Sequence, residues 1–271
     1  ELVNYTQNPN YYQPLFLNLF LAKSYRENTL IICISKYLEE LCRQHKIYNT
    51  WHRPNPVDEE MFNLNYNSIS KKELFGFNEK DKVILQIAKF MPLKNQIFML
   101  NVLENLPNEY KLALVGPVDH TGVHKVRDLN YINELKDLID KLKLNSRILL
   151  DMTFTKTPEK FMKACDVFVI PSKNEGLSTV MLEALSCGKP VITNKLGSVF
   201  DIWIDEKLNG KTVELNAEKW ASEILKIINI PKKKLQISSK KILDVASTET
   251  IDIEYYKRIK QLINYNILNF K

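Results

Sequence analysis

Residues 170–199 read IPSKNEGLSTVMLEALSCGKPVITNKLGSV, an order of residues that predicts a strand end, a turn, a helix and a second strand. The apolar run DVFVIPS at 166–172 is typical of a short strand that is buried on both faces of a parallel sheet. Ser178 or Thr179 can cap the helix that follows, and Gly188 can end it. The segment therefore predicts a parallel α/β sheet with a helix N-terminus just beyond one of its strands.

Two carboxylates in this segment are placed to bind one ligand. Glu175 follows the strand, and Glu183 lies about a turn and a half into the helix. They are expected roughly 10 Å apart, with Gly176 and the free N–H groups of the helix N-terminus between them. Two hydroxyl-binding acids around a phosphate site indicate a nucleotide sugar, and neither acid has a basic partner in the neighbouring sequence. The alternative is that Glu175 only complements the helix dipole and that Glu183 is a surface residue.

The same segment resembles the retaining glycosyltransferases of family 4, which have the two-domain GT-B fold and a signature of two glutamates separated by seven residues. Further blocks carry this resemblance along the chain. They are VILQIAKFMPLKNQ at 83–96, KLALVG at 111–116, ACDVFVIPS at 164–172 and LNGKTV at 208–213. The resemblance implies an α/β, doubly wound, Rossmann-like domain that binds a nucleotide-sugar donor.

The resemblance also implies roles for individual residues. In the family, the first glutamate contacts hydroxyls of the donor sugar and the second binds the ribose, which implies these roles for Glu175 and Glu183. The backbone between them is expected to hold the donor sugar and the diphosphate. Its residues are Gly176, Leu177, Ser178 and Thr179. Gly116 is expected beside them at the ends of the strands, and Met152 near the base, where the family commonly has glycine.

A pair of cations, usually Arg and then Lys five residues later, neutralises the diphosphate in this family. The corresponding residues are Lys89 and Lys94, so the implied catalytic group is Glu175, Lys94 and Lys89. Lysine keeps the charge of arginine but lacks the planar fork that binds phosphate through two hydrogen bonds. Without the resemblance, both lysines would be interpreted as solvated loop residues. No metal and no cofactor is expected, because cationic side chains and a helix N-terminus serve the diphosphate.

The hydrophobic pattern predicts three parts. Residues 1–54 are expected to be the end of an acceptor-side Rossmann-like domain, with a strand at 29–35. Residues 55–245 are expected to be the donor domain, in which strands alternate with helices. The strands are expected near Val83, Lys111, Arg147, Asp166, Pro190 and Lys211. Residues 246–271 are expected to form a helix.

In the family, this terminal helix packs back on the first domain. Ile251, Tyr255, Ile259 and Leu262 are expected on one side of it. Only 54 residues precede Asn55-Pro56, which stands where the family has an interdomain Asn-Gly turn after a whole acceptor domain. Two interpretations stay open, a fragment of a longer protein and a natural short chain that is completed by a partner subunit.

The composition favours a folded protein with an anionic partner. The chain has 271 residues, of which 45% are hydrophobic, enough for one large core or two small ones. Its formal charge of +6 suits anionic substrates or an acidic membrane surface. The densest basic cluster is the lysine run 232–234 with Lys240 and Lys241, for which a solvated helix face is favoured over a phospholipid contact.

The cysteines and the apolar runs indicate a location. No apolar run approaches the length of a membrane span. The four cysteines lack metal-ligand spacing, and Cys165 and Cys187 lie in apolar helical stretches that usually bury free thiols. These features predict a cytoplasmic protein, with a peripheral contact on the cytoplasmic membrane face as a further expectation.

Other chemistries are disfavoured. His120 and His124 have a spacing that binds metal on a helix, but Gly122 interrupts such a helix and no third ligand is evident, so a loop pair is favoured. The lysine clusters lack the aromatic neighbours that nucleic-acid binding needs, so no nucleic-acid partner is expected.

Together, these observations predict a retaining glycosyltransferase that transfers a hexose from a UDP- or GDP-sugar to a hydroxyl of a glycan or lipid-linked acceptor. The first alternative is a nucleotide-sugar-binding subunit without catalysis of its own, which needs a partner with an acceptor domain. The second is another GT-B enzyme, such as an epimerase or a phosphorylase.

Overall fold

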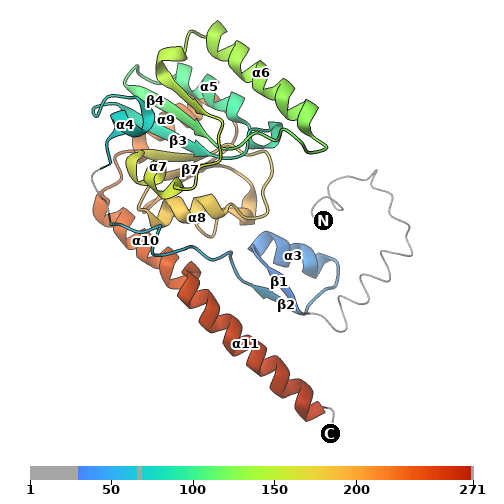
Figure 1. Ribbon diagram of the computed structural model, residues 1–271. Helices are drawn as coiled ribbons and strands as arrows, with labels where there is room; N and C mark the ends of the chain where they lie inside the picture. Colours follow the sequence, from blue (N-terminus) through green and yellow to red (C-terminus); the bar gives the residue numbers. More distant parts are fainter. Residues whose placement is uncertain (1–29, 66–68, 270–271) are drawn as a thin grey trace.

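The computed structural model describes residues 30–65 and 69–269, which form a large α/β unit, a small unit near the start of the chain and a long C-terminal helix (Figure 1). The small unit contains a two-stranded parallel sheet of β1 (Ile31–Cys33) and β2 (Thr50–His52), joined through α3 (Lys36–Gln44). The long helix is α11 (Thr248–Asn269). β1 confirms the strand expected at 29–35, of which Thr29 lies outside the described residues.

The large unit is built on a six-stranded parallel sheet with the order β5-β4-β3-β6-β7-β8. The strands are β3 (Lys82–Ile87), β4 (Tyr110–Val115), β5 (Ile148–Asp151), β6 (Val167–Ile170), β7 (Val191–Asn194) and β8 (Gly210–Val213). They confirm all six strand positions expected from the sequence. β6 and β7 are buried along their whole length, because helices cover both faces of the sheet.

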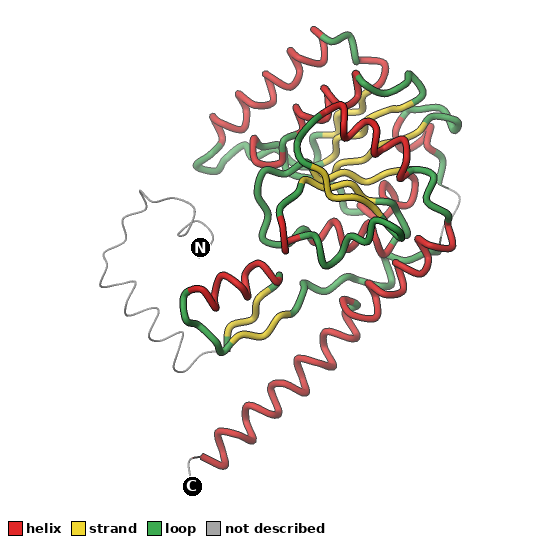
Figure 2. The backbone as a smooth tube through the Cα atoms, turned by 180° about the vertical axis from the view of Figure 1, so that it is seen from behind, coloured by secondary structure: helices red, strands yellow, loops and turns green. Residues whose placement is uncertain are grey.

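The helices form one layer on each face of the sheet (Figure 2). One layer contains α4 (Lys71–Phe75), α7 (Pro158–Ala164), α8 (Thr179–Ser186) and α10 (Lys232–Ala246). The other contains α5 (Gln96–Glu104), α6 (Lys125–Lys141) and α9 (Ala217–Ile227). Three short 3-10 helices, η1 (Pro92–Lys94), η2 (Asn145–Arg147) and η3 (Gly197–Val199), lie between these elements. The doubly wound α/β sheet expected from the sequence is therefore confirmed.

The strand order reverses between β3 and β6, and this reversal decides where a ligand can bind. β3 leads outward through β4 to β5, whereas β6 leads outward through β7 to β8. The loops at the carboxyl ends of β3 and β6 therefore turn away to opposite faces and leave a crevice between them.

Contacts between distant parts of the sequence join the small unit to α11. The rings of Trp51 and Tyr255 lie with their centroids 5.1 Å apart, and Arg53 forms an ion pair with Glu254. The terminal helix therefore packs on the first part of the chain near its beginning. The apolar residues that come later in α11 do not pack on the small unit in this way.

Ile259 and Leu262, which were expected on the same side as Ile251 and Tyr255, do not share the burial of Ile251. Ile251 is 4% exposed, whereas Ile259 is 52% and Leu262 37% exposed. The physical reason is that α11 extends beyond the small unit, so no described part of the chain covers this stretch (Figure 1).

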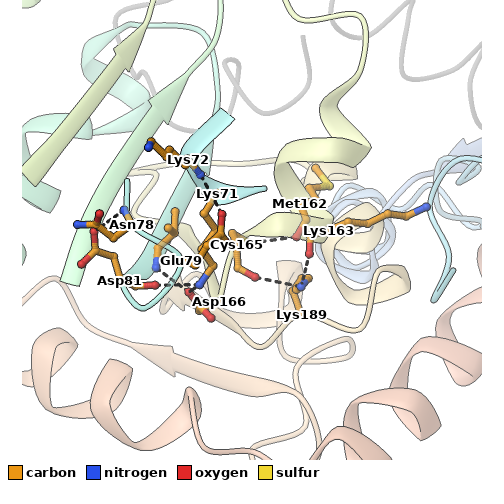
Figure 3. A network of polar contacts seen from close by, with 11 residues as sticks. Lys71, Lys72, Asn78, Glu79, Asp81, Met162, Lys163, Cys165, Asp166 and Lys189 are labelled. Carbon is orange, nitrogen blue, oxygen red and sulfur yellow. Dashed lines mark hydrogen bonds and ion pairs between the residues drawn. The ribbon is translucent and has the colours of Figure 1, made fainter. Parts of the chain in front are cut away.

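A polar network holds the amino ends of β3 and β6 together (Figure 3). Asp166, just before β6, accepts hydrogen bonds from Lys71 Nζ at 2.7 Å and from the backbone N–H of Val83 at 2.7 Å. Lys189, just before β7, donates to the carbonyl oxygens of Lys163 at 2.7 Å and Cys165 at 3.0 Å. Because these bonds lie at the amino edge of a parallel sheet, they stabilise the fold at the end opposite to the ligand crevice.

The thiols and the lysine cluster lie where the sequence placed them. All four cysteines lie among the described residues, are buried and form no disulfide, and burial raises the pKa of the Cys165 and Cys187 thiols to about 12. The lysine run 232–234, Lys240 and Lys241 are exposed on α10. Within residues 30–65 and 69–269, no helix has both the length and the apolar character to cross a bilayer.

The amino-edge network predicts the effect of removing Asp166. We expect Asp166→Ala to lower the free energy of unfolding by about 2–3 kcal/mol, because the N–H of Val83 loses its acceptor and the ammonium of Lys71 loses its carboxylate partner and keeps the carbonyl oxygen of Asp81. Urea unfolding followed by circular dichroism measures this change. The matched control is Glu223→Ala, which removes an exposed pair with Lys226 and should change stability by less than about 1 kcal/mol. An Asp166 variant as stable as this control would contradict the assignment.

Candidate functional site

Three loops meet at the carboxyl edge of the sheet, beside the reversal of strand order. They connect β3 to α5, β4 to α6, and β6 to α8. The backbone N–H of Lys173 donates to the carbonyl of Leu93 at 2.9 Å, and that of Phe90 donates to the carbonyl of Pro117 at 3.0 Å. The loop after β3 is therefore bonded to both of its neighbours, which brings together residues that lie far apart in the sequence.

Glu175 and Lys94 form a direct ion pair in this crevice. Lys94 Nζ lies 2.6 Å from Glu175 Oε1, and the Glu175 side chain is only 9% exposed. The expectation for Glu175 concerned the neighbouring sequence, whereas the tertiary structure supplies a distant partner. This partner lies 81 residues away in sequence and reaches Glu175 only because β3 and β6 are neighbours.

Lys89 is held by two carboxylates, although 34% of its side chain is exposed. Its Nζ is 2.9 Å from Asp119 Oδ2 and 3.4 Å from Asp128 Oδ2. The hydrogen bond from Lys89, together with a backbone bond from Gly122, holds the pKa of the Asp119 carboxyl well below its usual range. Asp128 is fully buried and also pairs with Arg127 at 2.8 Å. The positive charge of Lys89 is therefore compensated inside the protein.

The start of α8 keeps backbone donors for a ligand. Ser178 occupies the N-cap position, as expected, but its side chain makes no capping hydrogen bond. The Thr179 hydroxyl instead accepts a hydrogen bond from Asn55 Nδ2 at 3.0 Å. The first N–H groups of the helix therefore lack a side-chain cap, which is the arrangement that favours an anion.

The turn before α8 combines an anchor with open space. Leu177 is buried in the core, so it fixes the turn against the sheet. At Gly176, an added Cβ would meet only Ile34 Cδ1, at 4.0 Å. Contacts with the described residues therefore do not explain the glycine, and a ligand that approaches the backbone closely would explain it.

Glu183 is partly buried in α8, and among the described residues its carboxylate has no ion-pair partner. Burial raises the pKa of this carboxyl from its ordinary 4.5 to about 7. An unpaired carboxylate in such surroundings lowers stability, and groups of this kind gather at functional sites. Hydrogen bonds from the hydroxyl groups of a ligand would stabilise this carboxylate.

Gly116 and Met152 lie at the same edge of the sheet. Gly116, directly after β4, has a φ of +151°, and an added Cβ would lie 2.1 Å from the carbonyl oxygen of Ala88. Only glycine fits this approach, so Gly116 sets the distance between two loops of the site. Met152, directly after β5, is partly buried and packs on the apolar cluster of the α5 and α6 layer.

The structure adds partners that the sequence analysis missed, namely Asp119, Asp128 and Asn55. Each acts on a predicted residue from a distant part of the chain, so no local spacing indicates it. His120 and His124 lie in the loop before α6, as expected. In the part of the chain that the structure describes, no group of three or more His, Cys, Asp and Glu side chains is arranged to hold a metal ion.

Comparison with known proteins connects this geometry to a family. The family model described as "Glycosyl transferases group 1" matches residues 68–243. An uncharacterized glycosyltransferase of Methanocaldococcus jannaschii is 28% identical over 204 residues, which cover 73% of this chain and 49% of that protein.

A second relative has a more specific name. The N-acetylgalactosamine-N,N'-diacetylbacillosaminyl-diphospho-undecaprenol 4-alpha-N-acetylgalactosaminyltransferase of Campylobacter jejuni is 30% identical over 156 residues, or 57% of this chain and 39% of that protein. The chain thus spans about half the length, or less, of these two relatives.

A solved structure shows the same architecture. Alr3699/HepE of Anabaena in complex with UDP superposes with a TM-score of 0.82 at 20% identity, over 94% of this chain and 70% of that one. At this identity the likeness shows the fold, and it confirms the GT-B type of α/β sheet expected from the sequence.

The raised pKa of Glu183 predicts a pH-dependent effect of Glu183→Gln. Because the folded-state pKa of about 7 lies above the ordinary 4.5, ionisation of this carboxyl opposes folding increasingly as the pH rises from 4.5 to 7. We expect the variant to be more stable than the unmodified protein by about 1–2 kcal/mol at pH 8, and the gain to disappear toward pH 4.5.

Chemical denaturation of the ligand-free proteins at both pH values measures this gain. The control is Glu134→Gln on the exposed side of α6, for which no such difference is expected. A gain that is equal at both pH values would show that burial of the ionised Glu183 is not its cause.

Proposed function

Because the chain belongs to the glycosyl transferases of group 1, we propose that it forms the donor side of a retaining enzyme. This enzyme would transfer a hexose from a UDP- or GDP-sugar to a hydroxyl acceptor, without a metal or another cofactor. The observation that carries the proposal is the meeting of Lys94, Glu175 and the uncapped start of α8 where the strand order reverses. A cation, a carboxylate and free N–H groups are what a sugar diphosphate needs.

In this proposal, Lys89, Lys94 and the first N–H groups of α8 bind the diphosphate. Negative charge grows on it when the bond between the sugar carbon and the phosphate oxygen breaks and leaves its electron pair on that oxygen. Fixed cations and N–H donors near this oxygen therefore stabilise the transition state more than the bound donor. The acceptor hydroxyl replaces the diphosphate on the sugar.

Donor binding would exchange the partners of the two lysines. In the free protein, Glu175 neutralises Lys94, and Asp119 with Asp128 neutralises Lys89. A diphosphate that takes Lys94 leaves the carboxylate of Glu175 free to accept hydrogen bonds from the hydroxyls of the sugar. The ion pair thus couples recognition of the diphosphate to recognition of the sugar.

Glu183 would bind the ribose. The two ribose hydroxyls are donors, and donors that bond to the ionised carboxyl stabilise it and bring its raised pKa down again. Ribose binding and ionisation of Glu183 therefore support each other. Gly176, Leu177, Ser178 and Thr179 would hold the sugar and diphosphate through their backbone, with Gly116 and Met152 on the base side.

The acceptor would be a glycan or a lipid-linked sugar, held by an acceptor domain of the same polypeptide or by a partner subunit. The name of the Campylobacter relative includes a diphospho-undecaprenol-linked sugar, which supports this class of acceptor. Such a substrate would bring a cytoplasmic protein to the membrane surface, where the exposed lysines of α10 fit anionic headgroups.

A second candidate is a nucleotide-sugar-binding subunit that does not catalyse transfer alone. One feature favours it: every ligand contact that we propose for the described residues is a contact with the nucleotide-sugar donor. Donor hydrolysis by the chain in the absence of an acceptor domain would exclude this candidate.

The proposal predicts that the 271-residue chain binds a nucleoside diphosphate without metal. We expect UDP, GDP or ADP at a hundred times its dissociation constant to stabilise the folded protein by about 2.7 kcal/mol, seen as a higher melting temperature. EDTA should leave the shift unchanged, and Lys94→Ala should weaken diphosphate binding more than binding of the free nucleoside. A folded sample that none of the three diphosphates stabilises would contradict the donor site, and a loss with EDTA would indicate a metal-dependent site.

Substitution of the two glutamates should affect different steps, because we propose a different role for each. We expect Glu183→Gln to weaken binding of diphosphate and intact donor alike, by about 1–3 kcal/mol. Glu175→Gln should leave diphosphate binding unchanged or strengthen it, because Lys94 loses its competing carboxylate. With the acceptor-binding part present, the same change should lower the transfer rate strongly.

Calorimetry with the diphosphate and a transfer assay measure these two effects, with Glu134→Gln as the matched surface control. If Glu175→Gln weakens diphosphate binding as much as Lys94→Ala does, the main role of Glu175 is to orient the lysine. Full transfer activity in Glu175→Gln would remove it from the catalytic group.

A further inference from the structure

We propose that Gln86, Gln96 and Asn95 are positioning residues that place the ammonium groups of Lys89 and Lys94, and thereby set the affinity for the diphosphate. This inference rests on the proposed function, because it assigns a role to residues behind the same site. None of the three is expected to touch the ligand. They act on the turn between β3 and α5 that carries both lysines.

Each of the two glutamines forms a hydrogen bond with the backbone at the opposite end of this turn. Gln86 lies before the turn, in β3, and its Nε2 donates to the carbonyl oxygen of Lys94, at the far end, at 2.7 Å. Gln96 lies after the turn, at the first position of α5, and its Nε2 donates to the carbonyl oxygen of Lys89, at the near end, at 2.9 Å. The glutamines are 3% and 1% exposed. Each lysine is thus fixed by an amide from the opposite side of the turn.

Asn95 ties the same turn to the loop that carries Glu175. It has a left-handed backbone, with φ 57° and ψ 41°, a conformation that asparagine tolerates better than most residues. Its Nδ2 donates to the carbonyl oxygen of Pro171 at 3.2 Å, and the backbone bond between Lys173 and Leu93 lies beside it. With the pair of Lys94 and Glu175, these contacts join the two loops at three points.

The unsatisfied atoms of the glutamines favour a positional role over a purely stabilising one. Within the described residues, Gln86 Oε1 and Gln96 Oε1 are buried and accept no hydrogen bond. A buried acceptor of this kind lowers stability, whereas an apolar side chain of the same size would avoid the penalty. Such a side chain would, however, release the carbonyls of Lys89 and Lys94. The two amides are explained if the position of the lysines matters more than that penalty.

The chemistry of lysine explains why its backbone must be held. An ammonium is a point charge on a flexible stem and lacks the planar fork by which arginine aligns itself with a phosphate. Its attraction to a phosphate falls with distance, so the anchoring of the stem affects how much of that attraction is realised. With lysine at both positions, geometry has to come from the backbone of the turn.

The test uses Gln86→Met and Gln96→Met in the 271-residue chain. Methionine keeps the length and the volume of glutamine but has no N–H donor. Calorimetry compares UDP with uridine, and GDP with guanosine, for each variant and for the unmodified chain. We expect each variant to lose about fivefold to tenfold in diphosphate affinity and less than about twofold in nucleoside affinity, since a nucleoside does not reach the lysines.

A matched control separates position from stability. Asn209 is also a buried amide, 3% exposed, but lies before β8 at the opposite edge of the sheet, where it donates to the carbonyl of Trp203 at 2.9 Å and to Ser238 Oγ at 2.7 Å. Asn209→Leu should lower the melting temperature and leave the ratio of diphosphate to nucleoside affinity unchanged. If a glutamine variant fails to fold, Asn95→Gly carries the same comparison, because it keeps the left-handed backbone and removes only the amide.

The outcomes are distinct. An affinity ratio that the variants leave unchanged, or an equal loss for diphosphate and nucleoside, would overturn the positioning role while the proposed function stands. An unmodified chain that binds neither UDP nor GDP would overturn the proposed function, and this inference with it. A selective loss of diphosphate affinity, together with an unchanged ratio in Asn209→Leu, supports both.

Discussion

The parallel pairing of β3 with β6 is the constraint on which the rest of the structure depends. Only two residue pairs define its register, Ile84 with Val167 and Leu85 with Phe168. The pairing joins two halves of the sheet that lead outward in opposite directions, and neighbouring strands lie about 4.8 Å apart. The loops beyond these two strands must therefore lie next to each other. A cationic turn and an acidic loop from distant parts of the chain become neighbours for this reason alone.

The polar groups at the two edges of the sheet differ in their hydrogen bonding. At the amino edge, Asp166 and Lys189 have hydrogen-bond partners that join strand to helix and loop. At the carboxyl edge, Glu183 has a raised pKa, and Gln86 and Gln96 keep buried acceptors without a partner in the described part of the chain. These unfavourable groups beside the crevice fit a site that is shaped for a ligand, whereas the bonds of Asp166 and Lys189 stabilise the fold at the amino edge.

The charges at the carboxyl edge are compensated in a way that a ligand can exchange. Lys94 and Lys89 are each paired with carboxylates, so the free protein does not hold two uncompensated cations together. In the proposed function, a diphosphate would replace these internal partners, and its net contribution to binding would be the difference between the two sets of interactions. Under that proposal selectivity would depend on geometry, and the two glutamine bonds to the backbone of the lysine turn would serve it.

The sequence by itself determined the elements and their order. Apolar runs predict all six strands of the large sheet, and the spacing within 170–199 predicts α8 and the places of Glu175 and Glu183, because both signals are local. Only the tertiary structure decided the partners. Lys94 meets Glu175 across 81 residues, and Asp119 reaches Lys89 across 30, while no described residue covers Ile259 and Leu262 on α11. These contacts depend on which strands become neighbours, and periodicity along one strand carries no information about the strand beside it.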